Sequence, residues 1–215
     1  MSLTTSSIAA PQVHANPLGM PGLSNRVMAL LQTSAAMQTP HTGRTLFDHL
    51  LGTHLLLESW GNTQAVCLAG LFHSIYGTNA FAHQSLMQSQ RSELRAAIGE
   101  EAEALAWLFC SIDRPRAILL GLQQSYLGDF VELMVRRDAM GSTQARQAMG
   151  ASPEQLQALA EIECANLIEQ GSWGTALQEL YCAAMDGTAA LSDAALAALR
   201  AGWTHKLSIR QRTAA

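Results

Sequence analysis

Apolar residues recur along most of the chain at the three- to four-residue spacing of α-helices. One such stripe runs through Val27, Leu30 and Leu31, and the next includes Leu46 and Leu50. No segment shows the sustained alternation of apolar and polar residues that marks strands, and no repeat of fixed period is present. The pattern predicts an all-α protein, a bundle of about seven or eight helices.

Capping residues mark where several of these helices begin and end. Ser24 and Thr45 each precede an apolar stripe and are typical N-cap residues, and Gly61 ends the second helix. Ser152, followed by a proline in the first turn, starts a helix, and Ser192 caps the last one. We therefore expect helices joined by short connections.

The segment 64–76 is apolar on nearly every face of a helix, which is typical of a central, buried helix. It ends in an abrupt polar patch that contains His73, Ser74, Tyr76 and Thr78. Polar side chains at the end of a buried helix are candidates for chemistry.

A length of 215 residues suits one well-buried core, which we expect at 23–207. Residues 1–22 are rich in proline, glycine and small polar residues, which predicts a flexible leader. Residues 208–215 are expected to form a solvated C-terminal tail.

Composition narrows the classes of partner. Hydrophobic residues make up 48% of the chain and charged residues 14%, which argues against disorder and is compatible with a homodimer. The net charge is −4 and the basic residues form no stripe, so we expect no nucleic-acid partner.

No apolar run approaches the roughly 20 residues that span a bilayer, and the N-terminal segment lacks the features of a signal peptide. We therefore expect a cytoplasmic protein without a membrane partner. The four cysteines form no CxxC pair, and we interpret all of them as small buried hydrophobes.

His49 and His73 fall on two consecutive helices joined by a short glycine-containing turn. Short connections favour antiparallel neighbours, so the two imidazoles are expected to converge in an apolar interior. A buried histidine pair needs hydrogen-bond partners or a metal ion, because each unpaired buried polar group costs about 1–3 kcal/mol. The alternative is that both are core histidines with satisfied hydrogen bonds.

These residues carry a family resemblance. The stretches 47–50 and 68–75, with His49 and with His73 followed by Ser74, resemble the first two ligand motifs of the HD-domain superfamily. The hydrolase domain of the RelA/SpoT-type alarmone enzymes is similar, also over 98–105. The His-Ser-x-Tyr-Gly-Thr signature resembles an uncharacterised bacterial family with an HD-like fold. The resemblance covers about residues 44–112 and implies a compact HD-like helical bundle.

The resemblance implies a metal site, but two of its anionic ligands are replaced. Ser74 stands where HD enzymes carry aspartate, and Asn166 is the best counterpart of their final aspartate. Neutral ligands suit hard cations such as Mg²⁺ poorly. The cofactor is therefore a divalent metal (Fe, Mn or Zn) held by His49 and His73 with Glu163, Glu161 or Asn166, or there is none. For each carboxylate the alternative is a solvated helix face.

The candidate residues fall into two groups. The candidate catalytic residues are His49, His73, Ser74, Tyr76 and Thr78. The candidate substrate-binding residues are Arg44, Asn166 and Glu163. In a metal-free version of the site, His73 or His49 is the general acid or base and Tyr76 a hydrogen-bond donor.

Three functions remain open at this point. The first is an HD-like enzyme with an atypical metal site, a hydrolase or an oxygenase, acting on a small molecule. The second is a non-catalytic ligand-binding or interaction module that kept the fold without metal. The third is a helical partner-binding or dimerisation protein, which only the low charge suggests.

Overall fold

The fold comes from a computed structural model that describes residues 23–34, 36–41, 43–78, 82–125, 128–136 and 149–213, the last ten by their backbone only. Of these residues 64% are helical, and they contain nine α-helices and two small strand pairs. The helices are α1 (Asn25–Thr33), α2 (Leu46–Ser59), α3 (Gln64–Leu71), α4 (Arg91–Ile98), α5 (Glu100–Ser111), α6 (Arg116–Gln124), α7 (Pro153–Glu169), α8 (Thr175–Met185) and α9 (Asp193–Thr213), with a 3₁₀ turn η1 (Gln88–Gln90). The predicted leader, 1–22, lies outside the described residues.

The mostly helical class is confirmed, but the expected count of seven or eight helices was wrong. Gly99 divides one predicted helix into α4 and α5, because its φ of 92° is left-handed and interrupts the helical hydrogen-bond pattern. The central helix α3 is also shorter than predicted, since Phe72 to Tyr76 form turns. The helix α9 continues through the segment predicted as a tail as far as Thr213.

Two short antiparallel strand pairs were not predicted. Strand β1 (Pro40–His41) pairs with β2 (Arg44–Thr45), and β3 (Val131–Leu133) pairs with β4 (Met149–Ala151). Strands of two or three residues are too short to show alternation in a sequence. The first pair matters for the site, because it leads directly into α2.

The predicted helix starts are confirmed at Ser24, Thr45 and Ser152, whose side chains accept hydrogen bonds from the first turns of α1, α2 and α7. Thr45 and Ser152 belong to capping boxes, with Asp48 and Gln155 as the reciprocal partners. These caps fix the starts of the two helices that carry most of the site.

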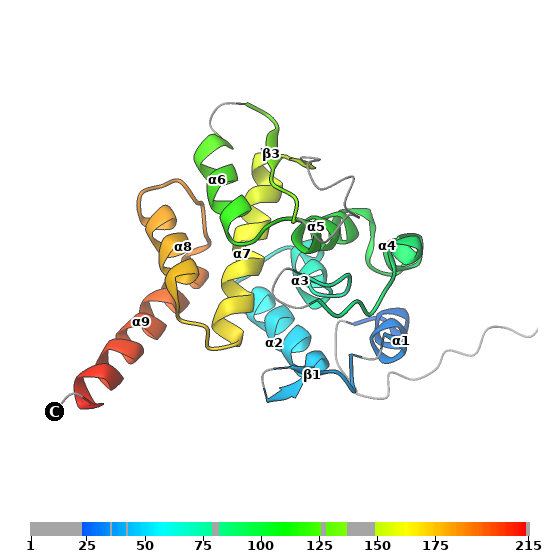
Figure 1. The fold of residues 1–215 in the computed structure, drawn as a ribbon, viewed down its shortest axis with the longest axis horizontal. Coiled ribbons are helices and arrows are strands. Elements are labelled where there is room, and N and C mark those ends of the chain that lie inside the picture. The colour runs from blue at the N-terminus through cyan, green and yellow to red at the C-terminus, as the bar shows by residue number, and fades with distance from the viewer. Residues whose placement is uncertain are drawn as a thin grey trace, which may run out of the picture.

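The helices α2, α3 and α7 pack against one another at the centre of the molecule, and α5 packs on α3 (Figure 1). The buried apolar residues form two clusters, one containing Leu57, Phe109 and Leu156 and the other Leu46 and Phe72. The helix α3 contributes to both clusters, which confirms that it is central.

Among the described residues, no helix is both long and apolar enough to cross a membrane. The interpretation of all four cysteines as buried was wrong for one of them. Cys67, Cys110 and Cys164 are buried, whereas Cys182 on α8 is exposed.

Candidate functional site

The predicted convergence of His49 and His73 is confirmed. His49 lies on α2 and His73 two residues beyond the end of α3, and both are almost fully buried, with 0% and 1% exposure. Their Nε2 atoms face each other at 3.1 Å, and the rings are nearly perpendicular. The close packing of α2 on α3 brings the two side chains together.

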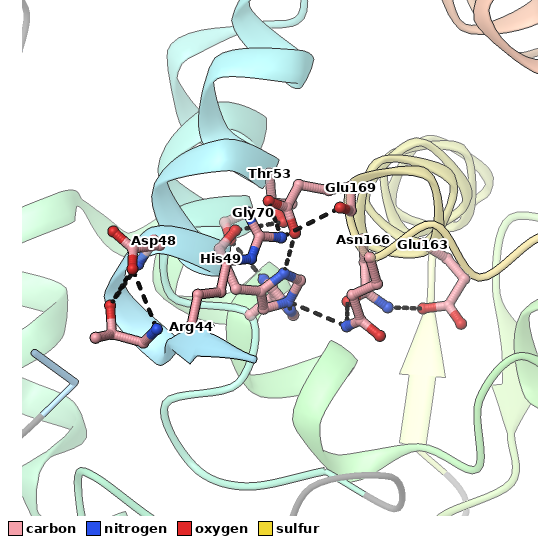
Figure 2. A network of polar contacts seen from close by, with 11 residues as sticks. Arg44, Asp48, His49, Thr53, Gly70, Glu163, Asn166 and Glu169 are labelled. Atoms are coloured by element: carbon pink, nitrogen blue, oxygen red, sulfur yellow. Dashed lines mark hydrogen bonds and ion pairs between the residues drawn. The ribbon is translucent and has the colours of Figure 1, made fainter. Parts of the chain in front are cut away.

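The outer nitrogen of each ring is held by an acceptor. His49 Nδ1 lies 2.5 Å from Glu169 Oε2 at the end of α7, and His73 Nδ1 lies 2.6 Å from the carbonyl oxygen of Gly70 (Figure 2). A carbonyl oxygen and an ionised carboxylate only accept, so each Nδ1 carries the proton. In a neutral imidazole the inner nitrogen, Nε2, then presents a lone pair.

The pKa values agree with this assignment. Burial raises the pKa of the Glu169 carboxyl, but hydrogen bonds from His49 and Arg44 outweigh it, and the net pKa is below the usual value. Burial, followed by the proximity of His49, holds the pKa of His73 well below its ordinary value. At neutral pH, Glu169 is ionised and His73 is neutral.

Arg44 and His41 enclose His49 from the side of the first strand pair. Arg44 forms an ion pair with Glu169 Oε1, and its Nη2 donates to the Glu169 carbonyl oxygen at 3.2 Å. The His41 ring stacks on the His49 ring, with centroids 4.5 Å apart and an interplanar angle of 28°. The strand pair before α2 and the end of α7 thus both hold the imidazole of His49 in place.

A chain of side-chain amides continues from His49 along α7. Gln170 Nε2 lies 3.2 Å from His49 Nε2 and donates to Asn166 Oδ1 at 2.9 Å. Asn166 Nδ2 is 3.4 Å from Glu163 Oε2, and Glu163 forms a buried ion pair with Arg114. A continuous chain of polar contacts therefore connects His49 to the ion pair of Glu163 and Arg114.

The structure brings together some of the predicted site residues and separates others. Asn166 and Glu163 belong to the amide chain, and Arg44 contacts Glu169. Glu161 lies elsewhere, because its carboxylate binds the Ser192 backbone and Asn62.

The polar residues that follow His73 are buried, and one of them, Tyr76, contacts α5. The side chain of Ser74 is buried with 4% exposure and that of Thr78 with 2%. The Tyr76 hydroxyl donates to Glu103 Oε1 at 3.2 Å, and burial raises the pKa of Tyr76 above its usual range.

Three residues of the site were missed in the sequence. Glu169 and Gln170 follow each other at the C-terminal end of α7, and His41 lies in a two-residue strand. A carboxylate and an amide just before Gly171 are the only local signal, and such residues are common at solvated helix ends.

The donor atoms suit only some metal ions. Two imidazoles with their outer nitrogens hydrogen-bonded to fixed acceptors are the usual arrangement of histidine ligands. Two ligands on one tetrahedral zinc ion lie about 3.3 Å apart, close to the 3.1 Å observed here. Within the described part of the chain, however, no three His, Cys, Asp or Glu residues cluster as a metal site. Two imidazole nitrogens are ligands that borderline ions such as zinc or iron accept, whereas hard cations prefer oxygen-rich sites.

Comparison with known proteins gives one match. The family model described as "Domain of unknown function (DUF6817)" matches residues 30–114, less than half of the chain. The matched part contains both histidines and ends before α7, so it includes neither Glu169 nor Gln170. No curated protein and no solved structure gave a significant match.

Proposed function

We propose that the protein is an HD-like enzyme that acts on a small molecule at the His49–His73 pair, with a borderline divalent metal ion bound to that pair. The observation that carries the proposal is the meeting of two Nε2 atoms at 3.1 Å in a fully buried position. If each Nε2 presents a lone pair, the two atoms repel unless a cation lies between them, which is the role that we propose for the metal ion.

Each neighbouring residue has a definite task in this proposal. Glu169 holds His49 in the tautomer whose Nε2 faces inward, and Arg44 keeps Glu169 ionised. The Gly70 carbonyl does the same for His73. Gln170, next to His49 Nε2, orients the polar end of a bound molecule.

The metal ion defines the reaction class. His49 and His73 would hold the ion, and a zinc or iron ion there would supply activation of water for hydrolysis or, if it is iron, of dioxygen for oxygenation. The HD-like resemblance of residues 44–112 is compatible with both classes. The replacement of acidic ligands by Ser74 and Asn166 favours a softer ion than the magnesium or manganese of a carboxylate-rich site.

The test is elemental analysis of protein purified without chelators. We expect about one zinc or iron ion per chain, and its loss in both His49→Ala and His73→Ala. His54→Ala is the matched control, because His54 is also buried on α2 but its Nδ1 contacts the Cys67 carbonyl and not the histidine pair. If the bound ion is iron, activity is assayed as oxygen consumption. If it is zinc, activity is assayed as ester hydrolysis.

A metal-free protein, after attempted reconstitution with both ions, contradicts the metal-dependent enzyme. One observation then favours a non-catalytic ligand-binding module, the second candidate. The acidic residues nearest the pair are occupied, since Glu163 pairs with Arg114 and Glu169 with Arg44. In that case the hydrogen bond between the two Nε2 atoms stands without a metal ion.

A further inference from the structure

The chain of amides between the Glu163–Arg114 ion pair and His49 has a direction. Glu163 is paired with Arg114 and both are buried, so the Glu163 oxygens belong to a carboxylate and only accept hydrogen bonds. Asn166 therefore turns its Nδ2 toward Glu163 Oε2, 3.4 Å away, and donates to it (Figure 2). This leaves Asn166 Oδ1 facing Gln170 Nε2, which donates to it at 2.9 Å.

The same direction determines which end of the Gln170 amide faces His49. Its Nε2 atom has two hydrogens to donate, and it lies 2.9 Å from Asn166 Oδ1 and 3.2 Å from His49 Nε2. A reversed amide would place Gln170 Oε1 against Asn166 Oδ1, and two acceptors would then face each other without a proton. The buried ion pair therefore fixes Gln170 as a hydrogen-bond donor toward the histidine pair.

Gln170 is the outermost member of this chain. Glu163 and Asn166 are buried, with 2% and 6% exposure, whereas Gln170 is half-buried and is the C-cap residue of α7. Breaking the contacts of the two buried members would leave polar groups without partners, at a cost of about 1–3 kcal/mol for each group. The chain is therefore held in one direction, and its accessible end is the Gln170 N–H group.

We propose that the molecule bound at the histidine pair places an acceptor oxygen of a carboxylate or phosphate group beside His49, where Gln170 donates to it. Asn166 and Glu163 are positioning residues, because they act on the bound molecule through Gln170. The inference rests on the proposed function, which makes the pair the binding site and supplies a cation that favours an acid group.

The Gln170 N–H group lies against Nε2 of His49 in the structure. When the lone pair of that nitrogen binds the proposed metal ion, the N–H group loses its acceptor and is available to the oxygen of the bound molecule. An ammonium group has only donors and finds no partner in the Gln170 N–H group. The site should therefore select acids over amines.

The direction of the chain is tested in the metal-free protein by the nitrogen NMR resonance of His49 Nε2. Accepting a hydrogen bond shifts this resonance, so Gln170→Leu should move it. Asn166→Leu should move it in the same direction by a smaller amount, because the Gln170 amide is then released from its fixed orientation. Gln123→Leu, at an exposed glutamine of α6, should leave it in place. An unmoved resonance in Asn166→Leu contradicts the positioning role.

The chemistry of the bound group is tested with sodium acetate, sodium phosphate and methylammonium chloride, against sodium chloride at equal ionic strength. Binding is followed at the ring resonances of His49 and His73, in zinc-loaded protein or, if the protein takes up no metal, in metal-free protein. We expect saturable shifts with acetate for a carboxylate site or with phosphate for a phosphate site, and none with methylammonium. No saturable shift with either acid, or a shift with methylammonium, overturns the proposal.

Two substitutions of Gln170 separate binding from structure. Gln170→Glu replaces the donor by a carboxylate of the same size beside His49, so zinc affinity should rise while affinity for the acid probe falls at least about tenfold. Gln170→Leu removes only the hydrogen bond, and it should weaken binding of the acid about two- to tenfold and leave zinc affinity unchanged. Gln123→Glu adds the same charge on α6 and should change neither affinity. A loss of both affinities in Gln170→Glu would show that Gln170 is merely structural.

Metal content separates this inference from the proposed function. Zinc uptake together with an unmoved His49 resonance refutes only the direction of the chain. A moved resonance and saturable acid binding in a protein that takes up no metal refute only the metal-dependent enzyme.

Discussion

Two buried glutamates, Glu103 and Glu169, both bind arginine side chains, but they differ in what else they contact. Glu103 on α5 is 0% exposed, and its oxygens accept from Arg91, Arg95 and the Tyr76 hydroxyl. Glu169 binds Arg44 with one carboxylate oxygen and the Nδ1 of His49 with the other. The Glu103 carboxylate thus contacts two guanidinium groups and a phenol, whereas the Glu169 carboxylate orients an imidazole.

This difference separates a carboxylate that ties two helices together from one that orients a histidine. Arg91 and Arg95 reach solvent, and Arg91 also stacks on Trp107, so the Glu103 cluster ties α4 to α5. Glu169 acts through His49, because fixing Nδ1 determines where Nε2 points. Glu169, unlike Glu103, therefore holds a group whose second nitrogen faces another ring, that of His73.

Glu103→Gln should have the largest effect on stability. We expect the free energy of unfolding to fall by about 2–3 kcal/mol, because a carboxylate that is 0% exposed loses its charge-assisted hydrogen bonds from two arginines together with the bond from Tyr76. Urea unfolding measures this loss. Zinc affinity should stay unchanged, and a drop in affinity would show that the two regions are not separate.

Glu169→Gln should have the opposite profile. If His49 binds zinc as proposed, loss of the carboxylate that orients it should lower zinc affinity about 10- to 100-fold, measured by competition with a chelator. The unfolding free energy should fall by about 1 kcal/mol or less, because Arg44 is partly exposed and returns to solvent. Unchanged zinc affinity in this variant would refute the positioning role of Glu169.

The pH dependence of stability should be traceable to Glu103. Burial raises the pKa of this carboxyl, but hydrogen bonds from Arg91 and Arg95 outweigh it, and the folded-state pKa is lower than that of the unfolded chain. The stabilisation is therefore complete above about pH 4.5 and is lost as pH falls below it, with a slope of at most about 1.4 kcal/mol per pH unit. Unfolding curves between pH 6 and pH 3 should be flatter for Glu103→Gln than for wild type, and equal slopes would contradict this assignment.

The sequence was sufficient for the parts of the site that depend on local pattern. The Thr45 cap, the amphipathic α2 and the short turn to α3 together predicted that His49 and His73 meet. These features are readable because helix period and capping act over a few residues.

The partners of the pair depend on tertiary packing and could not be predicted. Glu169 lies far from His49 in sequence, and its role arises from the way the end of α7 passes α2. The assignment of Glu161 to the pair failed for the same reason, because a helical wheel gives a direction but not the neighbouring element. Gly99 gave no advance sign of its left-handed φ.

Gly52→Ala should give the smallest effect, and it should separate a change in zinc affinity from a change in stability. Gly52 lies within α2, and a Cβ atom there would collide with the carboxylate of Glu169. Alanine normally stabilises a helix interior by about 0.5–1 kcal/mol over glycine, so an unfolding measurement alone should show little net change. Zinc affinity should nevertheless fall about three- to tenfold, because the carboxylate is displaced from His49 although no ligand is altered.

In the Glu169→Gln background the same substitution should cause no further loss, since the two changes act on one contact. Additive losses in the double variant would instead place the effect of Gly52 outside that contact.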